Sequence, residues 1–381
     1  MKYLQEYRDP ALIEKLLASI DRQTQRPWTI MEVCGGQTHG FVKNGLIDLL
    51  PQKLNVIHGP GCPVCVTDPQ KIDTAVALSF APGCLLATYG DMLRVPGSHL
   101  SLQQAKAAGG QVKVFESPLD AVAFAEQNRE TTVIFFAVGF ETTAPASALA
   151  LKLARSKSLD NFKILVSHVL VPPVLQTILS GGQSRIDGFL AAGHVCTVSG
   201  YEDYLPLSKD YGVPFVVTGF EPVDLLLGVE KLVTLLEAGE NQVYNAYGRY
   251  VSARGNPHAR GLVDEFFETT QEDWRGIGSI AGGGLKLRAG YAHFDASGLL
   301  GESVCHSKHQ VMETMTGRGK CISGEILMGL RKPWECSEFG KTCTPQSPLG
   351  APMVSSEGAC AAYIHNRTNF EVSDDDMSHP S

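Results

Sequence analysis

The sequence lacks the features that mark nucleic-acid-binding, membrane and secreted proteins. Lys and Arg number 32 against 40 Asp and Glu, which gives a formal charge of -8 and leaves no basic block. Without such a block few phosphate counterions can be displaced, so we expect no nucleic-acid partner. No apolar run reaches the roughly 18 residues of a membrane span, and the polar N-terminus has no signal-peptide core. We therefore expect a cytoplasmic protein whose thiols stay reduced.

The composition is otherwise that of an ordinary globular chain. Of 381 residues, 44% are apolar and 19% are charged, which excludes a disordered or fibrous protein. At about 150 residues per domain, the length predicts two or three domains. Ten cysteines in a reducing compartment indicate metal binding or redox chemistry rather than structural disulfides.

Short apolar runs alternate with helical patterns from residue 28 to about 237. After an amphipathic helix at 10–21, the predicted strands are 28–33, 54–58, 84–88, 112–116, 132–138, 163–167, 194–198 and 213–218. Helical patterns lie between them at 38–50, 69–80, 99–108, 118–128, 143–157, 171–180 and 221–238. Such alternation predicts an α/β fold built from βαβ units on mostly parallel sheets.

Internal similarity and composition divide the chain into regions. Three segments, IMEVCGG, IFFAVGFET and PFVVTGFEP, each run an apolar strand into a glycine-containing turn. This echo predicts two similar α/β lobes, at 28–130 and 131–239. From 240 to 370 the alternation fades and glycine and polar residues increase, which predicts a loop-rich third region joined by the N-terminal segment 9–21. The acidic residues 371–381 are expected to form a disordered tail.

Reactive side chains follow six of the predicted strands. They are Cys34 and His39, Cys62 and Cys65, Asp91 and Arg94, Glu141 with Thr142 and Thr143, His168, and Glu221. Ligands of open α/β sheets bind beyond the carboxyl ends of the strands. The sequence therefore predicts one cleft, between the two lobes, that gathers these residues.

Cys62 and Cys65 form a Cys-x-x-Cys motif within GPGCPVC. Two thiols at this spacing can form a disulfide, and a following helix N-terminus can stabilise one of them as a thiolate. The same motif also ligates metals, so the residues alone leave both roles open. The alternative is a buried structural pair in a turn.

Cys34 lies in the segment EVCGGQTHG. The glycines after it allow a metal or substrate to approach the backbone, and Thr38 can cap the following helix, whose dipole would favour a thiolate. His39 adds a side chain suited to ligation or to acid–base chemistry. The alternative is a core cysteine at the end of a strand.

Four cysteines near the C-terminus form a second group. Cys321, Cys336, Cys343 and Cys360 are separated by 14, 6 and 16 residues. Four thiolates suit either tetrahedral zinc or an iron–sulfur cluster. Structural zinc usually shows pairs separated by two to four residues, so this spacing favours a [4Fe-4S] cluster over zinc, with free thiols as the third alternative.

Several segments together resemble the HypD family of [NiFe]-hydrogenase maturation proteins. They are EVCGGQTHG (32–40), GPGCPVCV (59–66), GDMLRVPGS (90–98), GFETTAP (139–145), GHVCTVSG (193–200), GFEPVDLL (219–226), WRGIGSI (274–280), FGKTCTP (339–345) and MVSSEGACAAY (353–363). The resemblance extends from about residue 3 to residue 363. It implies two related α/β lobes with a third region that binds an iron–sulfur cluster.

The resemblance also implies a function, partners and ligands. It implies a scaffold on which an iron carrying two cyanides and one carbon monoxide is assembled, in complex with HypC and with cyanide from HypE, which HypF charges. The family's metal-site cysteines map onto Cys34, Cys62 and Cys65. Its [4Fe-4S] cysteines map onto Cys321, Cys336, Cys343 and Cys360. Some members carry a further cysteine where this chain has Pro352, so the four candidates here have no spare.

Thiol and iron chemistry agree with such a role. Soft thiolates bind iron, and release of cyanide from a thiocyanate-like donor requires two electrons. A cluster supplies electrons singly and a Cys-x-x-Cys pair can store two, which gives a relay from the cluster through Cys62 and Cys65 to iron at Cys34.

Two other classes of protein stay open. The first is a thioredoxin-reductase-like thiol oxidoreductase, which would turn over dithiols without iron or HypC. The second is a zinc-stapled binding protein, which would hold zinc and be colourless.

Overall fold

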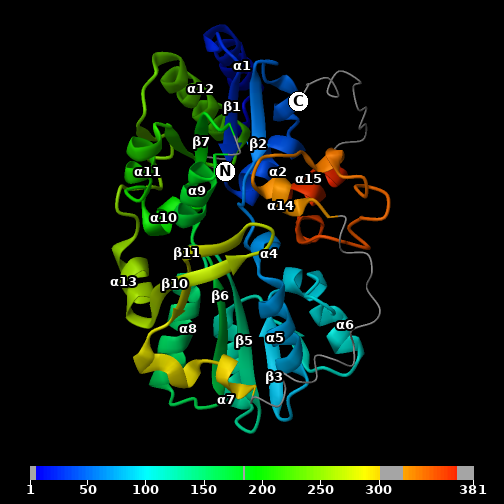
Figure 1. Cartoon of the computed structure of the whole chain (residues 1–381). Helices are drawn as coiled ribbons and strands as arrows, with labels where there is room; N and C mark the ends of the chain where they lie inside the picture. The colour runs from blue at the N-terminus through cyan, green and yellow to red at the C-terminus, as the bar shows by residue number, and fades with distance from the viewer. Residues whose placement is uncertain (1–5, 183–184, 301–320, 367–381) are drawn as a thin grey trace.

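Two parallel β-sheets organise the molecule, as Figure 1 shows in a computed structural model that describes residues 6–182, 185–300 and 321–366. A five-stranded sheet has the order β2-β1-β7-β8-β9, and a four-stranded sheet has the order β4-β3-β5-β6. Every strand pair within these two sheets is parallel. The predicted fold class, two α/β lobes with mostly parallel sheets, is therefore confirmed. The predicted tail at 371–381 lies outside the described residues.

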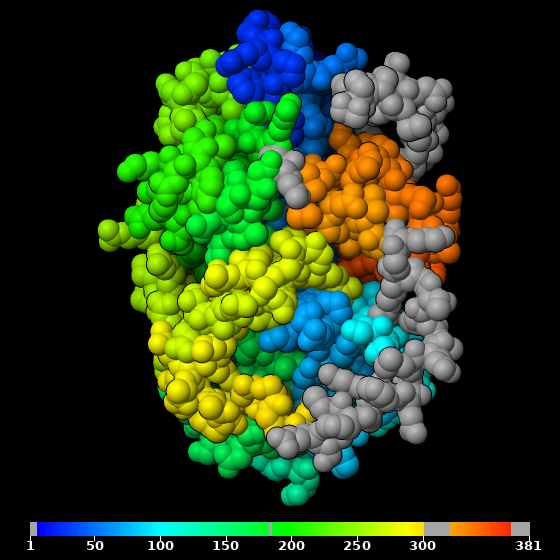
Figure 2. Space-filling view, in the orientation of Figure 1, coloured from blue at the N-terminus to red at the C-terminus, as the bar shows by residue number. Residues whose placement is uncertain are grey.

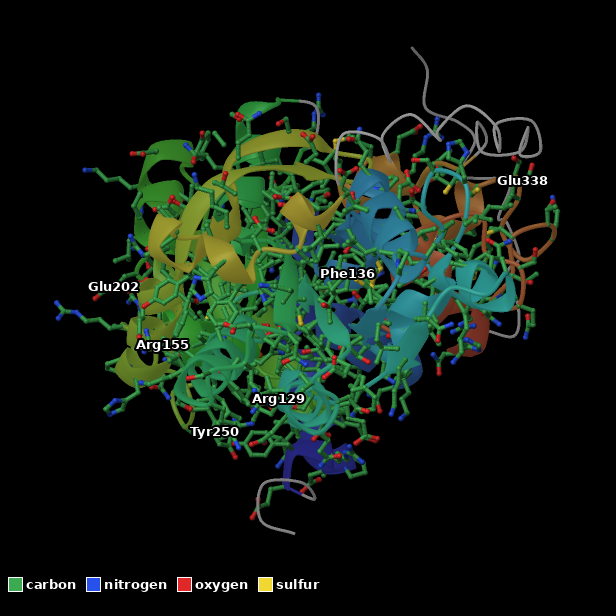
Figure 3. All side chains as sticks on the ribbon, turned by 90° about the horizontal axis from the view of Figure 1, so that it is seen from below. Arg129, Phe136, Arg155, Glu202, Tyr250 and Glu338 are labelled. Carbon is green, nitrogen blue, oxygen red and sulfur yellow. A yellow bond between two sulfur atoms is a disulfide. The ribbon has the colours of Figure 1, made fainter. Side chains whose placement is uncertain are left out.

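The strands are the short apolar runs of the sequence. The first sheet contains β1 (Trp28–Glu32), β2 (Leu54–His58), β7 (Gly188–Ala192), β8 (Phe215–Thr218) and β9 (Val243–Asn245). The second contains β3 (Cys84–Thr88), β4 (Val112–Val114), β5 (Thr132–Gly139) and β6 (Phe162–His168). Helices cover both faces of a parallel sheet, so its central strands are apolar on both sides, and seven of the eight β5 residues are buried. Figure 3 shows Phe136 of β5 inside the molecule and Arg155 and Glu338 at its surface.

Proline and polar caps begin many of the helices. The helices before residue 300 are α1 (Pro10–Gln23), α2 (Gly35–Lys43), α3 (Leu46–Leu49), α4 (Pro63–Val66), α5 (Pro69–Ser79), α6 (Leu102–Ala107), α7 (Pro118–Gln127), α8 (Ala144–Ser156), α9 (Val171–Ser180), α10 (Gly193–Ser199), α11 (Tyr204–Tyr211), α12 (Pro222–Ala238) and α13 (Pro257–Phe266). Asp9, Asp68, Ser117 and Asn256 each accept a backbone N–H at the start of the helix that follows. Among the residues that the structure describes, every helix is too short or too polar to span a lipid bilayer.

The sheets do not divide at residue 130. Strands β1 and β2 pair within the sheet that also contains β7 to β9, while β3 to β6 form the other sheet. The chain therefore leaves the first lobe after β2 and returns to it after β6 through α9. Alternation of strands and helices indicates which segments are strands, but it carries no information about which strands pair, so the predicted boundary was wrong for the sheets.

Several elements differ from the sequence prediction, among them helices α11 and α13, which the patterns did not predict. The predicted strand at 194–198 is helix α10, and the strand of this segment, β7, lies just before it. Residues predicted to be irregular form a hairpin of β10 (Phe267–Trp274) and β11 (Gly278–Leu287). The hairpin lies across the two lobes (Figure 1), with bridges from Trp274 to Thr67 and from Gly284 to Val169.

The C-terminal segment packs against the first lobe. It contains α14 (Ser323–Leu327), two single-turn 3-10 helices, η7 (Pro333–Glu335) and η8 (Ala351–Met353), and α15 (Ala359–Asn366). Helix α15 lies on α2, where Ala362 and Tyr363 pack against Val42. Figure 2 shows this orange segment beside the hairpin and the blue N-terminal lobe. The little regular structure between residues 328 and 358 agrees with the loop-rich prediction.

Candidate functional site

Cys34 and the Cys-x-x-Cys motif lie side by side because their strands are neighbours. Strand β1 ends two residues before Cys34, which is the N-cap of α2, and the register pairs Glu32 of β1 with His58 at the end of β2. The N–H of Gly35 donates to the carbonyl of Gly61 at 2.8 Å. A Cβ atom on Gly61 would lie 2.3 Å from the Cys34 nitrogen, so only glycine permits this approach.

Cys62 and Cys65 are joined as a disulfide. Their Cα atoms are 5.2 Å apart, and the N–H of Cys65 donates to the sulfur of Cys62 at 3.2 Å. Cys62 is the N-cap of the one-turn helix α4, and both cysteines are buried. The motif can therefore form the disulfide that its spacing allows, next to the strand end that carries Cys34.

The Cys34 thiol is buried, which corrects the expectation of an accessible thiolate. Its exposed fraction is 2%. Burial raises the pKa of the Cys34 thiol well above its usual range, and the nearby carboxylates Glu32 and Glu357 raise it further. The N–H groups of Gly36 and Gln37 at the helix N-terminus lower the pKa of this thiol, but burial outweighs them. Cys34 therefore lies in a closed site as a protonated thiol.

The imidazole at Cys34 belongs to His194, a residue that the sequence reasoning missed. The Cys34 sulfur is 3.8 Å from Nδ1 and 3.7 Å from Nε2 of His194, which stacks on Phe220. Burial lowers the pKa of His194, so the ring is neutral at pH 7. The sequence pattern predicts a strand at residue 194, and the histidine of the segment GHVC is the feature that could have indicated a site residue. His39, predicted for this role, lies half-buried on α2, and its buried Nδ1 has no hydrogen-bond partner among the residues that the structure describes.

A buried hydrogen-bond network supports the backbone of Cys34. Glu32, which is fully buried, accepts from the N–H of Cys34 at 3.0 Å and from the hydroxyl of Thr38. His58 extends this network. Its Nδ1 lies 2.6 Å from Oε1 of Glu32, and its Nε2 lies 2.8 Å from the Tyr363 hydroxyl. The network links the end of β1 to α15. In the sequence, the feature that could have indicated this network is Glu32, a glutamate within an apolar strand pattern.

The segment before α15 closes the Cys34 site. Gly35 lies against Glu357, since a Cβ on Gly35 would be 2.4 Å from the Glu357 Cβ atom. Ser355 donates to Asp91 at 2.9 Å, and Arg94 donates to two backbone carbonyls of the same segment, each at 3.0 Å. Asp91 and Arg94, predicted to line the cleft, therefore hold the C-terminal segment over Cys34.

The four C-terminal cysteines line one small cavity, which we call the four-cysteine cavity. Its lining residues are Cys321, Cys336, Cys343, Cys360, Ile322, Ser323, Ile326, Phe339, Gly350, Pro352 and Met353. Burial, and then the three neighbouring thiols, raise the pKa of Cys360 well above its usual range. Thiols that repel one another's charge around an apolar space fit a cationic iron–sulfur cluster. No group of three His, Cys, Asp or Glu residues within 6–182, 185–300 and 321–366 is arranged to hold a single metal ion.

The other predicted cleft residues lie elsewhere, so the expectation of one cleft was wrong. Glu141 lines a separate cavity between α9 and α11. His168 is buried in the second lobe, where its Nε2 lies 3.0 Å from the Ser147 hydroxyl. Glu221 forms an ion pair with Arg8 near the surface. Carboxyl ends of strands in two different sheets need not face a common space.

The fold and its cysteines define an α/β protein of two parallel sheets with two groups of closely placed thiols. A family model described as "Hydrogenase formation hypA family" and labelled HypD matches residues 11–367. Hydrogenase maturation factor HypD of Rhodobacter capsulatus is 42% identical over 371 residues, which cover 95% of this chain and 97% of that protein. HypD of Rhizobium leguminosarum bv. viciae is 44% identical, covering 95% of each chain. HypD of Escherichia coli (strain K12) is 41% identical, covering 96% of this chain and 98% of that protein. The chain therefore belongs to the HypD family of hydrogenase maturation factors.

Proposed function

We propose that the protein is the scaffold on which the Fe(CN)2CO moiety of [NiFe] hydrogenase is assembled, in a cytoplasmic complex with HypC. HypE, charged by HypF, would deliver the cyanide. The observation that carries the proposal is the buried position of Cys34, which lies next to the segment of the Cys62–Cys65 pair, against His194 and close to Glu357. The family resemblance supplies the partners and the cargo.

Iron, as the cargo, would bind at Cys34. A buried thiol keeps its proton until a cation compensates the charge of the thiolate, so metal and thiolate would form together. The neutral ring of His194 contacts this sulfur, and Glu357 lies near enough to affect its charge; either would accept the released proton or contact the cargo. One protein thiolate leaves the ligand set incomplete, and we propose that a HypC thiolate completes it.

The Cys62–Cys65 pair would supply the electrons for cyanide transfer. In the dithiol form, the pair loses two electrons and two protons as its S–S bond forms. The donor's sulfur–carbon bond takes up the two electrons and breaks, which releases the donor thiolate and leaves cyanide to bind iron. The Cys62–Cys65 disulfide would be the product form of this step, and its segment lies next to Cys34.

The four-cysteine cavity would hold the [4Fe-4S] cluster. All four of its thiols face a space that is otherwise lined almost entirely by apolar groups, which suits thiolate ligation of iron. When bound there, the cluster would supply single electrons to return the disulfide to the dithiol. Cys343 and Cys360 are buried, while Cys321 and Cys336 are half-buried.

A thiol oxidoreductase is the second candidate, because the disulfide and the four-cysteine cavity would serve it equally. It predicts turnover of dithiol substrates without iron at Cys34. A zinc-stapled protein instead predicts zinc at the cavity. Anaerobic purification followed by measurement of iron, sulfide and zinc tests the zinc alternative: we expect four iron and four sulfide per chain and no zinc. An assay for turnover of dithiol substrates without iron or HypC tests the oxidoreductase, and we expect no turnover.

A thiol count tests the Cys62–Cys65 step directly. Oxidised protein should titrate two fewer thiols than reduced protein, and Cys65→Ser should abolish this difference. Cys84→Ser is the matched control, because Cys84 is half-buried in β3 and should leave the difference unchanged. A count that oxidant does not alter would remove the electron-carrying role.

A further inference from the structure

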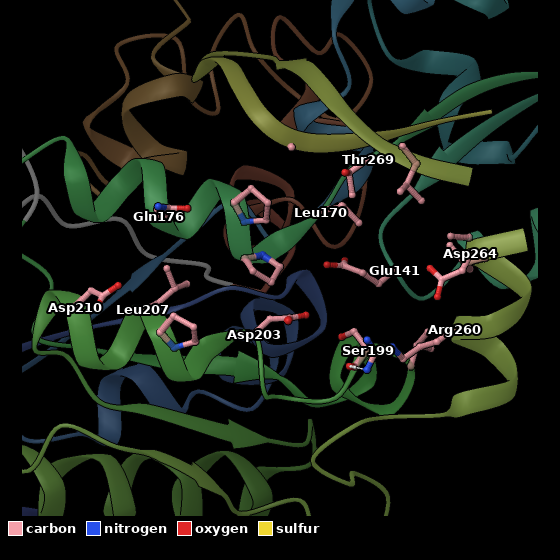
Figure 4. A pocket seen from close by; sticks show the side chains of 18 of the residues that line it. Glu141, Leu170, Gln176, Ser199, Asp203, Leu207, Asp210, Arg260, Asp264 and Thr269 are labelled. Atoms are coloured by element: carbon pink, nitrogen blue, oxygen red, sulfur yellow. Dashed lines mark hydrogen bonds between the residues drawn. The ribbon is translucent and has the colours of Figure 1, made fainter. Parts of the chain in front are cut away.

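A large cavity lies apart from both groups of thiols. Its volume is about 510 Å³, and none of the cysteines in the described part of the chain lines it. Its walls come from α9, α10, α11, α13 and the β10–β11 hairpin, as Figure 4 shows. A cavity of this size matches the volume of ordinary small-molecule sites. The proposed assembly of the iron moiety makes no use of it.

Glu141 forms the inner end of this cavity. It follows β5, is 9% exposed, and extends into the space between Leu170 and Asp203 in Figure 4. Its Oε1 accepts from the N–H of Val171 at 2.9 Å. Its Oε2 atom is buried and has no hydrogen-bond partner in the described part of the chain. A buried carboxyl oxygen without a partner is costly, so this atom indicates a missing donor.

Three further carboxylates stand on the rim. Asp203, Asp210 and Asp264 are exposed, and none of them forms an ion pair within residues 6–182, 185–300 and 321–366. The lining includes one cation, Arg260, whose guanidinium donates to the carbonyl of Arg254 at 3.0 Å. The cavity is therefore acidic at both its rim and its inner end, which disfavours phosphates and carboxylates as ligands.

The walls between rim and inner end are apolar. They include Leu170, Pro172, Pro173, Leu207 and Leu285. We propose that the cavity binds a small aliphatic amine or guanidine, with its charged end at Glu141 and its hydrocarbon stem along these walls. The rim aspartates attract such a cation and contact a second charge if it has one.

The charge state of Glu141 makes the proposal sensitive to pH. Burial, and then the charge of Asp203, raise the pKa of Glu141 to about 7. Several titratable or charged groups face Glu141 or share its cavity. They are Asp203, Tyr204, Asp210 and Tyr211 at or on α11, Cys196 on α10, and Arg260 and Asp264 on α13. The hairpin contributes Thr269, Gly282 and Leu285, which do not titrate. A bound cation favours the ionised carboxylate, so binding should release a proton near pH 7 and strengthen between pH 6 and pH 8.

Isothermal titration of the full-length chain with agmatine, a guanidine with a four-carbon stem and an amine, tests this site. We expect saturable binding with one agmatine per chain, and binding at least roughly tenfold weaker for the neutral 1,6-hexanediol and the anionic adipate. Glu141→Gln retains the acceptor for the Val171 N–H but removes the charge, so the affinity should fall about tenfold and the proton release should disappear. Asp160→Asn is the control, since Asp160 lies before β6, at the opposite end of that strand from Leu170; its affinity should not change.

A second variant covers the case in which Glu141→Gln fails to fold. Asp203→Asn combined with Asp210→Asn alters only exposed side chains and should weaken agmatine binding about threefold to fivefold. Equal binding of agmatine, 1,6-hexanediol and adipate would overturn the proposal. So would wild-type affinity in Glu141→Gln, or in the double rim variant.

Discussion

The Cys34 site and the four-cysteine cavity hold their thiols by different means. At the Cys34 site, strands β1 and β2 end side by side, and the buried Glu32 fixes the Cys34 backbone. Around the four-cysteine cavity, turns and irregular segments position Cys321, Cys336 and Cys343, and only Cys360 lies on an α-helix, α15. The hydrophobic cores of the lobes can position Cys34 without a ligand. For the four-cysteine cavity, by contrast, we expect much of the stability to come from the proposed cluster.

One chain of hydrogen bonds joins the two regions. It extends from Glu32 through His58 to Tyr363, which lies one turn after Cys360 on α15. Variants in one region, in the other, or in the link between them should therefore have different effects on stability and iron content.

The largest effect should follow loss of a thiol from the four-cysteine cavity. With no spare ligand, Cys343→Ala should remove essentially all iron and sulfide, and residues 321–366 should lose hydrogen-exchange protection. The far-UV circular dichroism of the two sheets should remain. Cys84→Ala serves as control and should retain iron. Full iron and sulfide content in Cys343→Ala would show that the ligand assignment is wrong.

The next largest effect concerns the support of Cys34. Glu32→Ala leaves the N–H of Cys34, the hydroxyl of Thr38 and the ring of His58 without their buried acceptor. The free energy of unfolding in urea should fall by about 3–5 kcal/mol. Glu130→Ala, at an exposed position, should change it by less than about 0.5 kcal/mol. A loss below 1 kcal/mol for Glu32→Ala would mean that the network does not hold the site.

Two buried groups of the second lobe make opposite contributions to the pH dependence of stability. Burial lowers the pKa of His168 to about 4, so its contribution to stability is present above its unfolded pKa and is lost as the pH falls. Burial raises the pKa of Glu141 to about 7, so its contribution is present at low pH and is lost as the pH rises. Between pH 5 and pH 7 the two contributions should nearly cancel.

Single variants should reveal how each residue changes the free energy of unfolding with pH. From pH 7 to pH 5, His168→Gln should gain about 2 kcal/mol of unfolding free energy, and Glu141→Gln should lose about 2 kcal/mol. Urea denaturation at both pH values measures the difference. Iron content should stay constant in both variants, because neither residue lines the four-cysteine cavity. If the free energy of unfolding changed in the same direction in both variants between pH 7 and pH 5, the contributions assigned to His168 and Glu141 would be wrong.

The smallest effect should come from the link itself. Tyr363→Phe keeps the ring that packs on Trp334 and Val42 but removes the hydroxyl that meets His58. The free energy of unfolding should fall by about 1 kcal/mol, with iron content unchanged. Loss of iron from this variant would show that the two regions are more tightly coupled than one hydrogen bond allows.

The regular parts of the fold were predictable from local patterns. Strands 54–58 and 84–88 match the structure residue for residue, and helix 171–180 does as well. Apolar runs bounded by turns and proline caps set these limits. The motif cysteines were also placed correctly at the ends of β1 and β2.

Features set by distant contacts were not predictable. The hairpin was missed because its glycines suggest a loop, whereas contacts with both lobes, such as the buried Trp274 against Thr67, stabilise it. The burial of Cys34 depends on Glu357, which comes from the far end of the chain. His194 reaches Cys34 because β7 pairs with β1, and alternation alone does not specify strand pairing.

The infrared spectrum of the Cys34→Ala variant in complex with HypC tests the central claim most directly. The variant should retain its [4Fe-4S] cluster, whose four cysteines lie in a different cavity, but lose the bands of iron-bound cyanide and carbon monoxide. Cys196→Ala, which removes a buried thiol from α10, should keep both the cluster and the bands. Bands of wild-type intensity in the Cys34→Ala complex would contradict the account, because the iron would then be held elsewhere.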